Sequence, residues 1–116
     1  MLIVLMDEPS LFVYPSADAA AREIEPPDAE TELRAAYDED GVPFRVEWLR
    51  PNRTRKVLFG LMRAIDFGEY RLVPDGPANP VGLIELLESY SNVEPAEAKP
   101  ELESLLSRLR FRRLHI

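Results

Sequence analysis

The chain lacks cysteine altogether and has a single histidine among its 116 residues. Without cysteine the protein can form no disulfide bond, no thiolate nucleophile and no zinc site with cysteine ligands. The only histidine is His115, one residue from the C-terminal end of the sequence. Histidine-based acid–base chemistry and metal binding are thereby nearly excluded, and we expect neither a metal nor a cofactor.

A phosphate-binding loop is also missing. Residues 2–10, LIVLMDEPS, look like the magnesium-binding strand of an ATP-binding-cassette ATPase, in which Asp7 would hold magnesium and Glu8 would polarise the attacking water. Both residues act on a nucleotide that a G-x-x-x-x-G-K-[ST] loop must already hold. The five glycines never have this spacing, and neither lysine follows a glycine. We therefore expect residues 2–6 to form a buried strand that turns at residues 7–10 into a second strand, LFVYP.

The sequence has no long hydrophobic run. Its apolar start ends at Asp7, lacks a basic leader and is too short to span a membrane, so we expect a cytoplasmic protein. A length of 116 residues is typical of one domain with a real core and one site or interface. We therefore expect a single domain over residues 1–116.

Charge is distributed unevenly along the chain, which carries −7 in total. Residues 1–40 carry −9 and residues 76–107 carry −5, whereas residues 41–75 carry +3 and residues 108–116 carry +4. An acidic surface repels nucleic acids and anionic membranes and attracts basic proteins. The expected partner is therefore a basic protein, with no membrane partner and with nucleic acid disfavoured.

The first half of the chain predicts a helix and then a hairpin. Ser16 is a good N-cap for a helix over Ala17–Glu25, which the two prolines at 26 and 27 end. Alanine and glutamate in residues 28–38 favour helix, but alternating apolar residues favour strands at Leu33–Tyr37 and Phe44–Trp48 around an Asp-Glu-Asp-Gly turn. We expect the hairpin, with Tyr37, Phe44 and Trp48 on one buried face.

The second half predicts another hairpin and two helices. Residues 50–56 read as a polar loop, followed by strands at 57–65 and 69–74 that flank Asp66-Phe67-Gly68. In this reading Gly68 has a positive φ and Gly60 marks a bulge. Helices are expected from Pro80, capped by Asn79, to Tyr90, and from about Pro100 to Phe111, each with an apolar stripe. The predicted fold is α+β, a mainly antiparallel sheet of about six strands with about three helices packed on one face.

No set of residues predicts catalysis. Asp38, Asp40, Gly41 and Glu47 match part of a calcium loop, but Ala36 occupies the position of the first ligand. Glu47 beside Trp48 has no second carboxylate with which to share acid–base chemistry. The arginines of residues 50–56 and 108–113 could contact phosphates, or could simply lie in a polar loop and at a helix C-terminus. We therefore expect a binding protein that is not an enzyme.

Residues 11–48 carry a pattern with a strand, a small helix that ends in Glu-Ile-Glu, an aspartate and then AAYDEDG. Its markers are Ala20, Ile24, Glu25, Asp28, Tyr37, Asp38 and Gly41. The pattern resembles small acidic immunity proteins of bacterial polymorphic-toxin loci, over about a third of the chain; Pro27 and Thr31-Glu32 depart from it. The resemblance implies tight binding to a cognate toxin domain, with no catalytic step. The carboxylates expected to contact that partner are Glu23, Glu25, Asp28, Glu30, Glu32, Asp38, Glu39 and Asp40.

One alternative from another functional class stays open. The two C-terminal helices, over residues 80–90 and 100–111, could serve a small cytosolic adaptor or chaperone-like regulator that dimerises or holds a client. A toxin-domain gene directly upstream would favour immunity, whereas an isolated gene beside a secretion operon would favour the adaptor.

Overall fold

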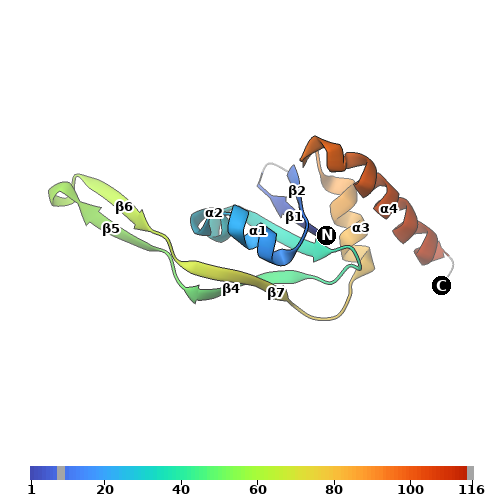
Figure 1. Cartoon of the computed structure of the whole chain (residues 1–116), viewed down its shortest axis with the longest axis horizontal. Coiled ribbons are helices and arrows are strands. Elements are labelled where there is room, and N and C mark those ends of the chain that lie inside the picture. Colours follow the sequence, from blue (N-terminus) through green and yellow to red (C-terminus); the bar gives the residue numbers. More distant parts are fainter. Residues whose placement is uncertain (8–9, 115–116) are drawn as a thin grey trace.

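The structure is a computed structural model that describes residues 1–7 and 10–114, so that Glu8 and His115, considered above as functional residues, lie outside the described part (Figure 1). The elements are β1 (Leu2–Met6), β2 (Ser10–Tyr14), α1 (Ala17–Glu23), α2 (Pro26–Thr31), β3 (Leu33–Asp38), β4 (Phe44–Arg50), β5 (Arg53–Val57), η1 (Leu58–Gly60), β6 (Met62–Asp66), β7 (Glu69–Pro74), α3 (Pro80–Ser89), β8 (Asn92–Glu94), η2 (Ala96–Ala98) and α4 (Lys99–Leu114). The predicted α+β class and the mainly antiparallel pairing are confirmed. Within the described ranges, eight strands form three sheets.

The central sheet has the strand order β3-β1-β2-β8. The predicted pairing of β1 with β2 is confirmed, in antiparallel register from Leu2↔Tyr14 to Met6↔Ser10. Strand β3 pairs antiparallel with the other edge of β1, and the short β8, which was not predicted, adds parallel to β2. The most apolar strand of the chain therefore lies between two neighbours.

Both faces of this sheet are covered. Ile3 and Leu11 point to one face, where they pack with buried leucines of α3 and α4. Leu2 and Val4 point to the opposite face, where α1, α2 and the β4–β7 ribbon cover them. The expectation of helices on a single face was wrong, because an unbroken apolar run such as residues 2–5 has two faces to bury.

Local signals placed the helix starts correctly. The Ser16 hydroxyl accepts a hydrogen bond from the Ala19 N–H at 3.1 Å, and the Asn79 side chain accepts one from the Gly82 N–H at 3.0 Å. Helix α1 ends at Glu23, and the two prolines then start the short helix α2, which was not predicted. Proline is tolerated in the first turn of a helix, where its missing N–H has no partner in any case.

The predicted hairpin over residues 33–48 was wrong. Both segments are strands, but β3 pairs with β1 and β4 pairs with β7, and a single bridge between Tyr37 and Pro43 joins the two segments within the described residues. Trp48 is 36% exposed, at the edge of the core rather than inside it. Alternation identifies which side of a strand is buried, but it does not identify the partner strand.

The second predicted hairpin was misplaced. The chain turns at Leu58–Leu61, not at residues 66–68, and residues 53–57 form strand β5 in register with β6 rather than a loop. Gly68 does not have a positive φ. Instead, a Cβ at Gly68 would lie 2.2 Å from the carbonyl oxygen of Arg50, so glycine is needed here for close backbone approach.

The result is a layered body from which one long two-stranded arm projects (Figure 1). The molecule measures 63 × 27 × 20 Å, with a Cα radius of gyration of 16.5 Å. A compact chain of this length would have a radius of about 13 Å. Among the described helices, none is long and apolar enough to cross a bilayer.

Candidate functional site

We define the arm as residues 50–68, which comprise β5, the tip at Leu58–Leu61 and β6 (Figure 1). It has five basic residues and one acidic residue, a net charge of +4. Large apolar side chains are exposed along it, with Phe59 107% and Leu61 85% accessible. The other exposed large apolar side chains of the arm are Leu58, Met62, Ile65 and Phe67. Clusters of exposed apolar residues mark interaction surfaces in soluble proteins.

The tip holds its apolar side chains outward by an unusual backbone. Leu58, Phe59 and Gly60 have φ values of 52°, 58° and 86°. The left-handed region costs a residue with a Cβ about 1–2 kcal/mol, and such strain concentrates at functional sites. Two bulky residues in this conformation, at the end of a projecting ribbon, indicate a recognition element.

The arm is fixed to the body at its root. The Asn52 amide donates to the Pro26 carbonyl at 3.0 Å and to the Glu30 carboxylate at 2.7 Å, while its own oxygen accepts from the Gly68 N–H at 2.7 Å. Arg50 donates to the Phe67 carbonyl at 3.3 Å. One asparagine thus ties both strands of the arm to α2.

The adjacent ribbon anchors the root in the core. The rings of Trp48 and Tyr70 pack with centroids 5.5 Å apart and an interplanar angle of 57°. The Tyr70 hydroxyl donates to the Ile24 carbonyl at 2.6 Å. Burial, and then the nearby Tyr14 and Asp28, raise the pKa of Tyr70 to about 12. The phenol therefore stays protonated and keeps its hydrogen bond at physiological pH.

The eight carboxylates predicted to bind the partner do not form one patch. Strand β3 separates five of them, on the α1–α2 side, from three at its end and in the turn that follows. We call the first group the acidic helix pair; its members are Glu23, Glu25, Asp28, Glu30 and Glu32. Asp28 is half-buried and the other four are exposed. Within residues 1–7 and 10–114, none of the five forms an ion pair.

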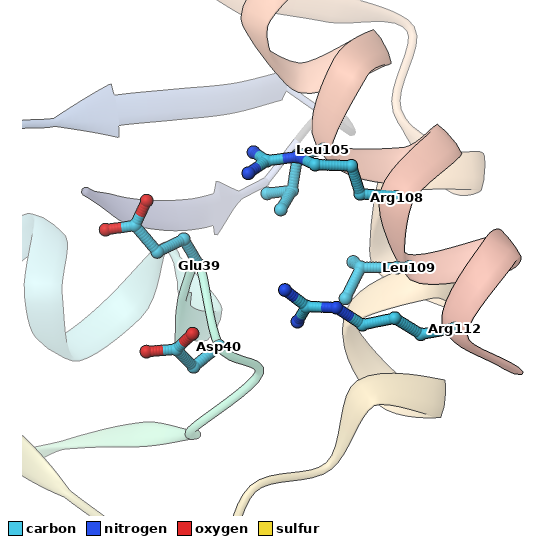
Figure 2. A pocket seen from close by; sticks show the side chains of 6 residues that line it. All are labelled: Glu39, Asp40, Leu105, Arg108, Leu109 and Arg112. Atoms are coloured by element: carbon cyan, nitrogen blue, oxygen red, sulfur yellow. The ribbon is translucent and has the colours of Figure 1, made fainter. Parts of the chain in front are cut away.

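Two of the three carboxylates of the second group, Asp38 and Glu39, form contacts within the chain. The Asp38 carboxylate accepts from the Asp40 and Val42 N–H groups, both at 2.9 Å, and so shapes its own turn. Glu39 pairs with the N-terminal ammonium at 3.2 Å. Figure 2 shows Arg108 and Arg112 of α4 on the opposite side of a small pocket of about 110 Å³ from Glu39 and Asp40. The basic C-terminal helix offsets the negative charge of this turn.

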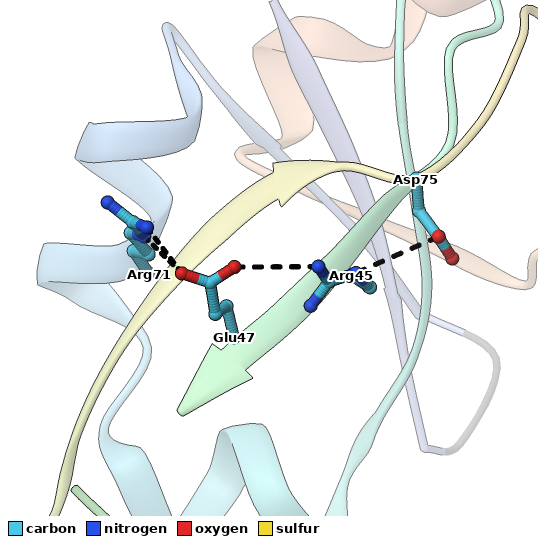
Figure 3. Close-up of polar contacts among 4 residues, drawn as sticks. All are labelled: Arg45, Glu47, Arg71 and Asp75. Atoms are coloured by element: carbon cyan, nitrogen blue, oxygen red, sulfur yellow. Dashed lines mark hydrogen bonds and ion pairs between the residues drawn. The ribbon is translucent and has the colours of Figure 1, made fainter. Parts of the chain in front are cut away.

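A third charged cluster lies on the outer face of the β4–β7 ribbon (Figure 3). The Glu47 carboxylate accepts from Arg71, with 2.7 Å to Nε, and from Arg45 at 3.4 Å. Arg45 also pairs with Asp75 at 3.7 Å. The hydrogen bond from Arg71 is the main reason why the pKa of Glu47 is lowered. Glu47 is thus a cross-strand ion-pair partner, and in the described residues no three acidic or histidine side chains gather as a metal site.

A groove opens at the end of the sheet opposite the arm root. Met1, Val13 and Tyr14 line it together with the carboxylates of Glu39, Glu97 and Glu101, and its volume is about 600 Å³. Glu39 is paired with the Met1 ammonium, so Glu97 and Glu101 supply its unpaired negative charge within the described residues. We call it the acidic groove. A groove lined by both apolar and acidic side chains is complementary to a basic segment that carries apolar side chains.

Sequence reasoning missed the arm as a site. The signal was present in the basic run RPNRTRK followed by the apolar run VLFGLM, but the two were interpreted as a loop and a strand. Comparison of the chain with protein-family models, with curated proteins and with solved structures finds no match, so the argument for function rests on the surfaces described above.

Proposed function

We propose that the protein is a non-catalytic binding protein of the immunity type, which binds a basic toxin domain and blocks its active site. The observation that carries the proposal is the acidic helix pair, with five carboxylates between Glu23 and Glu32. No ion pair with the described residues neutralises any of them. A basic partner would supply the missing counter-charges.

The electrostatic effect of this group reaches neighbouring side chains. The pKa of Tyr14 is raised first by burial and then by the charge of Glu23. Asp28 contributes in the same direction to the raised pKa of Tyr70. Negative charge close to a phenol disfavours its ionised form. Burial is the larger cause of both shifts, and the smaller contributions of Glu23 and Asp28 agree with a negative potential over α1 and α2.

The charge of the rest of the molecule adds to this potential. The whole chain carries −7 and the arm +4, so the remainder carries −11. A field of one sign accelerates the encounter with an oppositely charged protein and gives complementarity in the complex. Toxin domains that act on nucleic acids or nucleotides are commonly basic. An acidic surface can occupy the site on such a toxin where the phosphate groups of its substrate would bind.

The adaptor alternative has weaker support. The apolar stripes of α3 and α4 pack in the chain's own core, with Leu83, Leu87, Leu102 and Leu105 buried. The described part of α3 and α4 offers a client or a second helix pair the exposed Val81 and the groove beside it, which Arg112 and Arg113 also line. The immunity proposal needs no apolar helix face, and it is the one that we retain.

The test uses the product of the adjacent gene as the partner. Co-purification should give a complex whose association slows as salt is added. Replacing Glu23, Glu25 and Glu32 together by lysine should lower the association rate about tenfold or more and flatten its salt dependence. Exposed charges contribute little to stability, so the variant should remain folded. Glu30 is left unchanged because it accepts a hydrogen bond from Asn52.

A matched variant controls for net charge. Replacing Glu85, Glu94 and Glu103 by lysine changes the net charge equally, at exposed positions on α3, β8 and α4. This control should associate at close to the wild-type rate. If both triple variants slow association equally, or if the wild-type protein forms no complex, the proposed recognition surface is wrong.

A further inference from the structure

The starting observation is an excess of exposed surface. The accessible surface of the chain is 7603 Å², whereas a compact monomer of this mass exposes about 6,400 Å². The excess of about 1,200 Å² exceeds the roughly 800 Å² that each partner buries in a standard protein interface. The arm adds to this exposed surface, since Phe59 and Leu61 at its tip are 107% and 85% accessible.

The arm cannot bury its tip by folding back. The β5–β6 ladder, the ion pair of Arg55 with Asp66 at 3.0 Å and the Asn52 hydrogen bonds at the root hold it in its projecting direction. A stiff element loses little conformational entropy when it binds. The surface that covers the tip therefore belongs to another molecule.

The arm also indicates the charge of that molecule. Lys56 and Arg63 lie directly opposite each other in the β5–β6 register. Like charges in this position destabilise a ribbon, and an anionic group placed between them would turn repulsion into attraction. Ile65 lies on the same face, because alternate residues of a strand share a face. The arm thus fits a surface that is acidic and partly apolar.

The acidic groove has these properties. Met1, Val13 and Tyr14 in its lining can contact apolar side chains, and Glu97 and Glu101 can pair with the two cations. A second groove of about 310 Å³, between α3 and α4, is more apolar, but its charged lining of Asp40, Arg112 and Arg113 is net positive and would repel the arm. Charge therefore selects the acidic groove.

The groove and the arm of one molecule are at opposite ends of the body. Strand β3 starts beside α2, to which Asn52 ties the arm, and it ends at Asp38. Asp38 pairs with Leu2, and Leu2 pairs with Tyr14, so this end of the sheet forms the groove. The arm extends away from it (Figure 1). A chain therefore cannot fill its own groove, but two antiparallel chains can fill each other's.

We propose that the arm of each chain docks, with its apolar tip, in the acidic groove of a second copy, so that two chains form a closed dimer. The same two surfaces meet twice around a two-fold axis, which is the commonest symmetry of homo-oligomers. A basic toxin domain would be repelled by the arm, and nucleic acid or an anionic membrane would be repelled by the body, which carries −11. The acidic helix pair lies outside this contact, so the proposal is independent of toxin binding.

The test is a charge exchange followed by sedimentation velocity. The wild-type protein should sediment as a species of twice 13.2 kDa that dissociates on dilution and on addition of salt. Reversing the arm with Lys56→Glu and Arg63→Glu should weaken the dimer by at least about tenfold, and so should reversing the groove with Glu97→Arg and Glu101→Arg. Circular dichroism should confirm that both variants remain folded, because all four side chains are exposed.

Mixing the two variants gives the decisive measurement. In a mixed dimer the reversed arm meets the reversed groove and the native arm meets the native groove, so the mixture should dimerise with an affinity near that of the wild type. The double variant Glu85→Arg and Glu103→Arg, with the same change in net charge as the groove variant, should dimerise normally. A wild-type monomer at all concentrations, failure of the mixture to dimerise, or a monomer whose arm binds duplex DNA or anionic vesicles would each overturn the proposal.

Discussion

Replacing Gly68 by alanine tests how the arm is joined to the body. A Cβ at this position would lie 2.2 Å from the Arg50 carbonyl oxygen, 2.6 Å from the Pro51 carbonyl carbon and 2.7 Å from the Asn52 nitrogen. All three atoms belong to the backbone, so no side chain can rotate away. The strands at the root must separate to admit one methyl group.

The expected cost follows from three effects. Forcing a methyl group into filled space costs about 1–3 kcal/mol. Separating the strands also weakens the hydrogen bond from the Gly68 N–H to Asn52, which contributes about 0.5–1.5 kcal/mol. Alanine lowers the conformational entropy of the unfolded chain relative to glycine, which stabilises the folded state by about 0.4–1 kcal/mol. The net expectation is a loss of about 2 kcal/mol in the free energy of unfolding, or about 8 °C in Tm for a chain of this length.

Gly82→Ala is the matched control. A Cβ there would lie 2.6 Å from the Tyr37 hydroxyl and 2.7 Å from the Asn79 side chain. The Tyr37 hydroxyl can move, whereas displacing Asn79 weakens the cap of α3 at a cost of about 1 kcal/mol. Alanine favours helix by about 1 kcal/mol over glycine, which offsets that cost. Urea unfolding of both variants should therefore show a clear loss for Gly68→Ala and little change for Gly82→Ala.

Hydrogen exchange adds a local measurement. In Gly68→Ala the amides of the arm root should exchange faster than in the wild type, while those of α3 should keep their protection relative to global stability. If Gly68→Ala stays within about 0.5 kcal/mol of the wild type, as ordinary surface substitutions do, the close packing of the root is refuted.

Two further predictions concern protonation. Tyr70→Phe removes the donor to the Ile24 carbonyl and should cost about 1–3 kcal/mol in urea unfolding, because a buried acceptor loses its partner. The pKa of Tyr70 is about 12, above the ordinary value of 10.0. The free energy of unfolding of the wild type should therefore fall more steeply between about pH 10 and pH 12 than that of Tyr70→Phe. In an ultraviolet titration, the variant should lack the phenol that ionises at the highest pH. For Glu47 the pKa is lowered from 4.5, mainly by Arg71, so its stabilising contribution is present above pH 4.5 and is lost as pH falls through the folded value. Glu47→Gln should therefore flatten the acid side of the urea-midpoint profile, and an unchanged profile would contradict the ion pair.

Helix caps and apolar stripes, which act over a few residues, were read correctly from the sequence, whereas the local turn signal at residues 66–68 was not. The caps at Ser16 and Asn79 depend on one side chain and the N–H group three residues later. The stripe of α4 depends on spacing within one helix, and Leu102, Leu105 and Leu109 are buried. Such contacts are present in any fold that contains the segment, so local reasoning is sufficient for them.

Local sequence signals did not predict which strands pair with each other. Residues 33–37 and 44–48 both have the alternation of strands and a turn between them, yet each pairs with a more distant partner. The choice depends on which total arrangement buries more apolar surface, and β1 offers apolar side chains on both faces. For the same reason, residues 53–57 could not be recognised as a strand before β6 was placed beside them.

The properties of the candidate sites also divide into those that the sequence determines and those that the tertiary structure determines. Sequence alone determined the acidic character of residues 1–40 and the absence of cysteine and phosphate-loop chemistry, because charge and residue type do not depend on the fold. Only the tertiary structure decided that β3 separates the eight carboxylates into two groups, and that Arg108 and Arg112 face one of them. Only the tertiary structure decided that a basic, apolar segment projects as an arm and that a groove of opposite charge lies at the far end of the same chain. Both results depend on which distant residues are brought together, and a linear charge pattern does not contain that information.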